Sequence, residues 1–174
     1  GRMLAFERAA RRASSLAELN GLFGREVRRF GFTAYAAGFI PRDDAGAPET
    51  ARDPFLLLDW PRAWLELYAR QGFAQEHAVV AAARTATAPF TWRQLQARQP
   101  GASARIFAAA SAFGWNDGLL VPARDQAGSG PVGVVSLAAS TLDHLDETGL
   151  GQVTSLSLLA FRRARECPKQ ELGP

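Results

Sequence analysis

The order of helical and extended segments constrains the fold of this chain more than any other feature. Stretches with apolar residues at three- and four-residue spacing alternate with short runs rich in β-branched and aromatic residues. The last two extended runs flank a segment of turn residues, a pattern typical of an antiparallel hairpin. Helices combined with such a sheet predict an α/β fold: an α-β-α sandwich with a central antiparallel sheet of about five strands and helices on both faces.

A helix of about 16–29 is predicted from a capping signal and from apolar periodicity. Ser15 and Glu18 have the spacing of a reciprocal capping box, which satisfies two backbone donors at a helix start. Gly31 is expected to end this helix, because glycine readily takes the left-handed conformation found after a last turn.

A later helix is predicted to begin at Asp59, which can cap it, with Pro61 in the first turn and Gly72 at the end. The segment 41–53 is rich in Asp, Gly and Pro and predicts a loop. Three further helices are expected at about 76–84, 102–113 and 142–166, and strands at about 32–40, 55–58, 89–92, 118–124 and 132–139.

Composition excludes several classes of protein. The 174 residues, 47% of them apolar, are enough for one core and too few for two full-sized domains. The single cysteine, Cys167, excludes an internal disulfide framework, and the two histidines, His77 and His144, make a His-rich metal centre unexpected. No stretch approaches 18 uninterrupted apolar residues, and the N-terminus is charged. We expect a cytoplasmic protein without metal, cofactor or membrane contact.

Charge does not indicate nucleic-acid binding by these residues. The 20 basic residues nearly balance the 17 acidic ones and are spread along the chain, as on solvated helix faces.

No catalytic motif occurs. The chain lacks an H-E-x-x-H helix and a G-x-S-x-G elbow, and Gly128-Ser-Gly130 lacks the Lys-Ser/Thr of a phosphate loop. The acidic cluster Asp143–Glu147 is expected to open a helix, where the dipole stabilises carboxylates. The sequence therefore predicts that the protein is not an enzyme.

Aromatic residues cluster in one segment. Trp60, Trp64 and Trp92 lie within 33 residues, together with Tyr68 and Phe90, and the first two share a helix face with Tyr68. Buried indole N–H and phenol O–H groups need acceptors. Two interpretations remain open on spacing alone: a core face that uses backbone carbonyls, or an apolar small-molecule pocket with a few polar groups.

Five short motifs in fixed order resemble a known family. In order and spacing, over about residues 16–165, they resemble the autoinducer-binding domain of LuxR-type quorum-sensing regulators. The resemblance implies an α-β-α sandwich that holds an N-acyl homoserine lactone between sheet and helices. The motifs are Trp60-Pro61-x-x-Trp64-x-x-x-Tyr68, Val79-Val80, Pro89-Phe90-x-Trp92, Phe113-Gly114-x-x-x-Gly118-x-x-Val121-Pro122 and Gly133-x-x-Ser136-Leu137.

The resemblance also implies ligand contacts. Trp64 matches the tryptophan whose indole N–H binds the lactone carbonyl, and Ser136 matches a position that contacts the amide or 3-oxo carbonyl. Gly114 and Gly118 are expected to serve a tight turn and close packing. The rest of the expected ligand-binding set consists of aromatic walls and of small or apolar residues beside the acyl chain: Tyr68, Trp92, Trp60, Phe90, Val79, Ala36, Gly38 and His77.

Two positions depart from the family pattern. Trp60 stands where many members have tyrosine, and His77-Ala78 stands where members usually have Asp-Pro, the aspartate accepting the ligand's amide N–H. A neutral histidine can accept the same bond, at a loss of about 1 kcal/mol, or about fivefold in affinity. Glu76 would point about 100° away on a helix. Either His77 takes the aspartate's place, or the ligand is not an ordinary acyl homoserine lactone.

The leading hypothesis is a sensor domain at 1–167 that binds an acyl or aryl homoserine lactone. Residues 168–174 are then expected to begin a linker to a C-terminal helix-turn-helix domain outside this sequence, through which a homodimer would bind promoter DNA. A second hypothesis is a ligand-independent dimerisation or interaction module with a filled cavity. A third, a small hydrolase or transferase, lacks an identifiable nucleophile and base.

Overall fold

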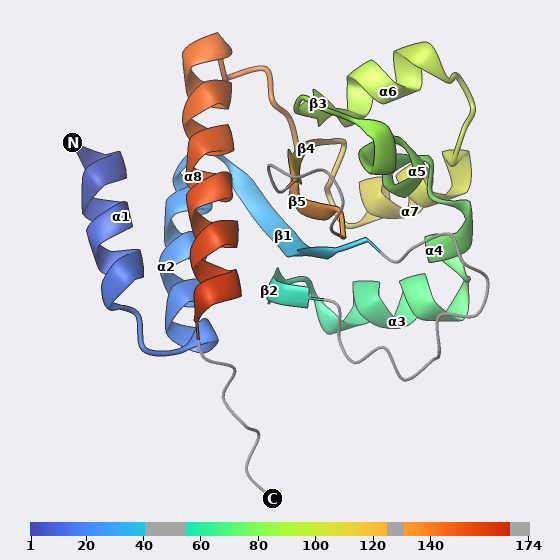
Figure 1. Ribbon diagram of the computed structural model, residues 1–174. Helices are drawn as coiled ribbons and strands as arrows, with labels where there is room; N and C mark the ends of the chain where they lie inside the picture. Colours follow the sequence, from blue (N-terminus) through green and yellow to red (C-terminus); the bar gives the residue numbers. More distant parts are fainter. Residues whose placement is uncertain (41–54, 125–130, 168–174) are drawn as a thin grey trace, which may run out of the picture.

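The computed structural model describes residues 1–40, 55–124 and 131–167 (Figure 1). Its centre is a five-stranded sheet in the order β2-β1-β5-β4-β3, in which all neighbouring strands are antiparallel. The predicted fold class is confirmed, while the expected loop at 41–53 and the hairpin turn at 125–130 lie outside the described residues. The strands are β1 (Phe32–Phe39), β2 (Phe55–Asp59), β3 (Phe90–Thr91), β4 (Asp117–Ala123) and β5 (Gly133–Ala139).

Helices cover both faces of the sheet (Figure 1). Three lie on one side: α1 (Arg2–Arg12), α2 (Leu16–Arg29) and α8 (Glu147–Glu166). Five short ones lie on the other: α3 (Arg62–Arg70), α4 (Phe73–Glu76), α5 (Ala78–Thr85), α6 (Trp92–Arg98) and α7 (Ala104–Ala112). In the part of the chain that the structure describes, no helix has the length and apolar character needed to cross a membrane.

Alternation along the strands divides the buried residues between two cores. On β1, Tyr35 and Ala37 join the core beneath α1, α2 and α8, whereas Ala34 joins the core beneath the short helices. Leu119 and Leu120 on β4 divide in the same way. Each strand therefore serves both layers, and the side chains of the second layer determine what lies between the sheet and α3–α7.

The predicted start of α2 is confirmed, with one changed partner. The Ser15 hydroxyl accepts from Glu18 N at 3.1 Å, as a capping residue should. The Glu18 carboxylate, however, accepts from Ser14 N at 3.0 Å rather than from Ser15 N. Gly31, with φ +93°, follows the end of the helix in a left-handed conformation, as predicted.

The prediction that Asp59 caps a helix is wrong. Asp59 ends β2, and its carboxylate forms an ion pair with Arg28 of α2, so it ties this strand to the opposite layer. Helix α3 begins at Arg62, after Pro61 with its extended ψ of 141°. It ends at Arg70, two residues before Gly72.

The aromatic segment contains a helix that the sequence prediction missed. Trp92 was expected in an extended piece, but it is the first residue of α6. Thr91 and Gln94 form a complete capping box: Gln94 N donates to Thr91 Oγ1 at 3.1 Å, and Thr91 N donates to Gln94 Oε1 at 2.9 Å. The T-x-x-Q pattern was thus visible in the sequence.

Two other helices have different bounds from those predicted. The segment expected as one helix at about 76–84 is α4 and α5, separated at His77. Helix α8 begins at Glu147 and not near residue 142, because the Asp146 side chain accepts from Gly149 N at 2.7 Å. Asp143 therefore precedes the helix instead of opening it. Cys167, the last described residue, is buried at the end of α8.

Gly118 on β4 lets the Trp92 ring pack directly on the sheet. A Cβ at this position would lie 2.5 Å from Trp92 Nε1 and 2.7 Å from the carbonyl oxygen of Leu137. The backbone carbonyl cannot move without disturbing the ladder, so the expected close-packing role of Gly118 is confirmed. Gly114 is also as expected, with φ +90° in the turn after α7.

We predict that Gly118→Ala destabilises the protein by about 1–3 kcal/mol, the usual cost of overpacking a core. Gly151→Ala is the matched control: Gly151 is an exposed residue of α8 with no neighbour near the position of its missing Cβ. This control should be neutral or stabilising by up to about 1 kcal/mol, from helix propensity. Urea unfolding measures both, and equal stabilities of the two variants would contradict the packing argument.

Candidate ligand-binding site

A cavity of about 690 Å³ lies between the sheet and helices α3–α7. Its volume is within the range of about 300–1,000 Å³ typical of small-molecule sites. Of the residues expected to bind ligand, Phe90 lies outside the lining: it is buried in β3 and pairs with Leu120. The others all line the cavity: Ala36, Gly38, Trp60, Trp64, Tyr68, His77, Val79, Trp92 and Ser136.

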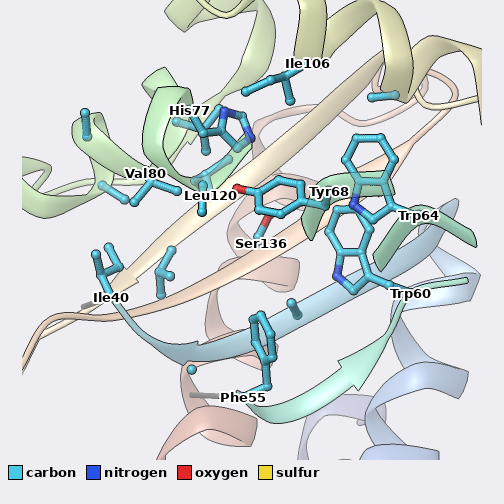
Figure 2. Close-up of a pocket in the computed structure, with 18 of the residues that line it drawn as sticks. Ile40, Phe55, Trp60, Trp64, Tyr68, His77, Val80, Ile106, Leu120 and Ser136 are labelled. Atoms are coloured by element: carbon cyan, nitrogen blue, oxygen red, sulfur yellow. The ribbon is translucent and has the colours of Figure 1, made fainter. Parts of the chain in front are cut away.

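Six rings in contact form one side of the cavity, which we call the aromatic wall. Successive ring centroids along it are 5.5, 5.9, 6.1, 6.0 and 5.5 Å apart. Figure 2 shows the two rings of one end, Trp60 and Trp64, beside each other. In order, the wall consists of Trp60, Trp64, Tyr68, His77, Phe107 and Trp92.

Small side chains on the sheet leave the space that the wall encloses. Ala36 and Gly38 of β1 and Ser136 of β5 line the cavity from the sheet side. Ile40 and Val134, which were not among the predicted contacts, also line it. Val134 stands two residues from Ser136 on β5, and Ile40 stands two residues from Gly38, directly after the end of β1, so the two-residue period of a strand could have identified them.

The contribution of α7 was also missed. Ile106, Phe107 and Ala110 line the cavity from this helix, and Arg84 lines it from α5. The one-, three- and four-residue spacing of the three α7 residues identifies a helix face. Nothing in the sequence, however, places that face beside α5 rather than in another core.

The tryptophans differ in the partners of their indole nitrogens. Trp115, outside the cavity lining, donates to Thr33 Oγ1 at 3.1 Å. Trp60 Nε1 and Trp92 Nε1 are buried and have no hydrogen-bond partner among the described residues. An unsatisfied buried donor costs about 1–3 kcal/mol, and both of these indoles belong to rings that line the cavity.

His77 faces the cavity, and its neighbour Glu76 does not. Burial lowers the pKa of His77 to about 4, so the ring is neutral near pH 7. Its Nδ1 is buried without a partner among the described residues. Glu76 is exposed and pairs with Arg105 at 3.4 Å. Of the two candidates for the missing aspartate's place, only His77 is positioned in the cavity.

The break between α4 and α5 is held by a residue of a distant segment. Ser103 Oγ donates to Glu76 O at 2.9 Å and accepts from Ala78 N at 2.7 Å. These bonds satisfy the backbone groups on either side of His77, whose ψ of 109° interrupts the helix. The hydroxyl thereby fixes the extended backbone that carries the imidazole.

Tyr68 adds a hydroxyl to the middle of the aromatic wall. Burial raises the pKa of Tyr68 to about 12, so the phenol stays protonated and can donate or accept. Within the described residues, no group of His, Cys, Asp and Glu is arranged to hold a metal ion. Apart from the Arg84 guanidinium, the hydrogen-bonding groups named here are neutral and the cavity is largely apolar, which suits reversible binding of a small amphiphilic molecule.

Comparisons with known proteins agree with this geometry. The family model of the autoinducer binding domain matches residues 15–164. A curated relative, the HTH-type quorum sensing-dependent transcriptional regulator RpaR of Rhodopseudomonas palustris, is 31% identical over 138 residues, which are 78% of this chain and 53% of RpaR. The chain thus spans about half the length of the curated relative it matches.

Solved structures share the fold. The N-acylhomoserine lactone dependent LuxR family transcription factor CepR2 of Burkholderia cenocepacia matches with a TM-score of 0.67 at 18% identity, over 95% of each chain. Escherichia coli SdiA matches with a TM-score of 0.64 at 16% identity, over 98% of this chain and 74% of that one. A complex of SdiA with octanoyl-rac-glycerol matches with a TM-score of 0.64 at 15% identity, over 99% and 67%.

Family model, relative and fold lead to one assignment. This family is a ligand-binding domain of transcriptional regulators and not an enzyme. The chain belongs to the autoinducer-binding domains of LuxR-type quorum-sensing regulators.

Proposed function

We propose that the chain senses an acyl or aryl homoserine lactone, which it binds in the cavity between the sheet and α3–α7. The observation that carries the proposal is the group of buried nitrogens without partners, on Trp60, His77 and Trp92, around an apolar space. A lactone amphiphile supplies carbonyl oxygens for the indole N–H groups and an apolar chain for the rest of the cavity.

The two ends of the cavity differ in polarity. Trp60 and Trp64 lie at one end in Figure 2, and Ile40 and Val80 lie at the other. We assign the lactone ring to the indole end, with the Trp64 N–H donating to its carbonyl, and the acyl chain to the aliphatic end. Ser136 lies between the two ends and is assigned to an acyl carbonyl.

Small residues on the sheet leave room for the acyl chain, and larger ones flank it. Ala36 and Gly38 are assigned to the chain's sheet side, and Val79 to its helix side. Phe90 is withdrawn from the proposed contacts, because it does not line the cavity.

His77 is proposed to take the place of the usual aspartate. As a neutral ring it can accept the ligand's amide N–H through one nitrogen, whereas Glu76 is turned toward Arg105. The alternative function, a ligand-independent module with a filled cavity, is disfavoured by the open volume of about 690 Å³.

We further propose that the full-length protein is a cytoplasmic homodimer. Its helix-turn-helix domain would follow residues 168–174 and bind promoter DNA, while residues 1–167 form the sensor. The support is the match to RpaR, an HTH-type regulator about twice as long as the matched segment.

A ligand that binds only the folded state stabilises it. At a hundredfold excess over the Kd, a homoserine lactone should raise the free energy of unfolding by about 2.7 kcal/mol. Thermal unfolding with a panel of acyl and aryl homoserine lactones tests this, with octanoylglycerol added because SdiA holds that molecule. If no member of the panel shifts the midpoint or binds in calorimetry, the proposed function is wrong.

Two tryptophan variants separate binding from folding. Trp64→Phe removes an N–H assigned to the ligand, so affinity should fall about fivefold. The smaller ring also loses packing in the core, so the empty protein should be less stable but still folded. Trp115→Phe removes the bond to Thr33 instead and should lower stability by about 1 kcal/mol. Because Trp115 supports the rings of Trp60 and Trp64 from outside the cavity lining, affinity should fall less than in Trp64→Phe. Calorimetric binding and urea unfolding of both variants measure this, and a Trp64→Phe protein that binds as tightly as the parent contradicts the assignment.

The lowered pKa of His77 makes stability depend on pH. Between the ordinary value of 6.5 and the folded-state value of about 4, the unfolded chain binds a proton that the folded protein does not. The free energy of unfolding should therefore fall as pH drops through this window, by at most about 3 kcal/mol, and the contribution of His77 should be constant above it.

Replacement of the ring tests this linkage. His77→Gln should flatten the slope between about pH 6.5 and 4 in urea unfolding, whereas His144→Gln, at a residue outside the cavity, should keep it. Parallel slopes for the parent and His77→Gln would show that His77 is not the group responsible.

A further inference from the structure

Three groups in the middle of the cavity can each donate or accept a hydrogen bond. A hydroxyl has one donor and two lone pairs, and a neutral imidazole has one donor and one acceptor nitrogen that exchange with the tautomer. Tyr68, His77 and Ser136 supply these groups and line the cavity. We call them the junction groups.

The junction groups lie where the polar and aliphatic ends of the cavity meet. Figure 2 shows them between Trp60 and Trp64 on one side and Ile40 and Val80 on the other. The ring of Tyr68 is 5.9 Å from that of Trp64, which places it next to the indole end. A ligand with its polar ring against the indoles and its chain toward Ile40 therefore has its linking group beside the junction groups.

Among the described lining residues there is no carboxylate. An ionised carboxylate only accepts hydrogen bonds, so it favours a linking group with an N–H and repels the lone pairs of an ester oxygen. Glu76, the neighbouring acid, is exposed and pairs with Arg105. Near the junction groups, no described lining residue therefore requires the ligand's linking group to carry an N–H.

We propose that this cavity binds acyl ligands whether an amide or an ester joins the acyl chain to the polar ring, with His77 as the adapting residue. With an amide, an imidazole nitrogen accepts the N–H. With an ester, the other tautomer presents its N–H to an ester oxygen. Nδ1 is free to take either role, since it has no partner among the described residues. The inference rests on the proposed function, that an acyl lactone occupies the site.

A pair of ligands that differ in one group tests the proposal. N-octanoyl homoserine lactone and α-octanoyloxy-γ-butyrolactone have the same ring and chain, and an oxygen replaces the N–H in the second. A cinnamoyl pair gives the same comparison with an aryl group. For the parent chain we expect the two Kd values of a pair to agree within about fivefold, measured by calorimetry at about pH 8.

Two substitutions of His77 that are nearly isosteric with each other, to asparagine and to aspartate, isolate the hydrogen-bonding role of this side chain. Asparagine can donate or accept, so His77→Asn should keep the ratio of the two Kd values close to that of the parent. An aspartate that is ionised at this pH only accepts, so His77→Asp should favour the amide by at least about tenfold more than the parent does. Ser136→Ala changes a different junction group. It should weaken the binding of the amide and the ester by similar factors, so the ratio of the two Kd values should stay close to that of the parent.

The outcomes distinguish the two proposals. If neither member of either pair binds the parent, the proposed function is overturned and the inference with it. If the amide binds the parent more than about tenfold tighter than the ester, the inference alone is overturned. If the parent binds both within fivefold, the inference is supported even where His77→Asp does not fold, and a folded His77→Asp without amide preference would remove His77 as the adapting residue.

Discussion

A single sheet that has to serve two cores is the constraint on which the rest of the structure depends. Because side chains alternate along a strand, Tyr35 and Ala37 fill one layer while Ala36 and Gly38 face the other. The first layer is closed by three helices with large apolar residues. The second is built on small residues, so its helices cannot reach the sheet everywhere, and the space that remains is the ligand cavity.

The cavity side depends on long-range contacts more than the other side does. Helices of four to nine residues are too short to be stable alone, so α3–α7 keep their positions through packing and through bonds to distant segments. Gly118 under the Trp92 ring and the aromatic wall itself are such contacts. On the opposite side, the 20 residues of α8 form a continuous cover. One layer is therefore covered by long helices, and the other by short helices that packing and long-range contacts hold in place.

Local signals predicted the strands, the late hairpin and helix 16–29, because hydrophobic periodicity and capping motifs involve residues that are close together in the sequence. Asp59 was misassigned because a capping aspartate and one that pairs with Arg28 across layers look alike in sequence. Helix α6 was missed although Thr91 and Gln94 carried its capping box.

For the site, the family motifs predicted the part of the aromatic wall from Trp60 to Tyr68, whereas Phe107 could be identified only from the tertiary placement of α7. Helix geometry predicted that Glu76 would point away from position 77, whereas its ion-pair partner Arg105, 29 residues away, is a tertiary contact that no local pattern reveals.

The hydroxyl of Ser103 gives the break at His77 a wider meaning. A continuous helix through residue 77 would make all of its backbone hydrogen bonds internally. The direction of the ring would then follow from the position of residue 77 in the helical turn alone. Here the direction is set by a residue on another segment, 27 positions from Glu76 in the chain. The orientation of the ring at position 77 thus depends on a side chain that does not line the cavity. A substitution of Ser103 would therefore change the lining of the cavity at residue 77 without replacing any residue that lines it.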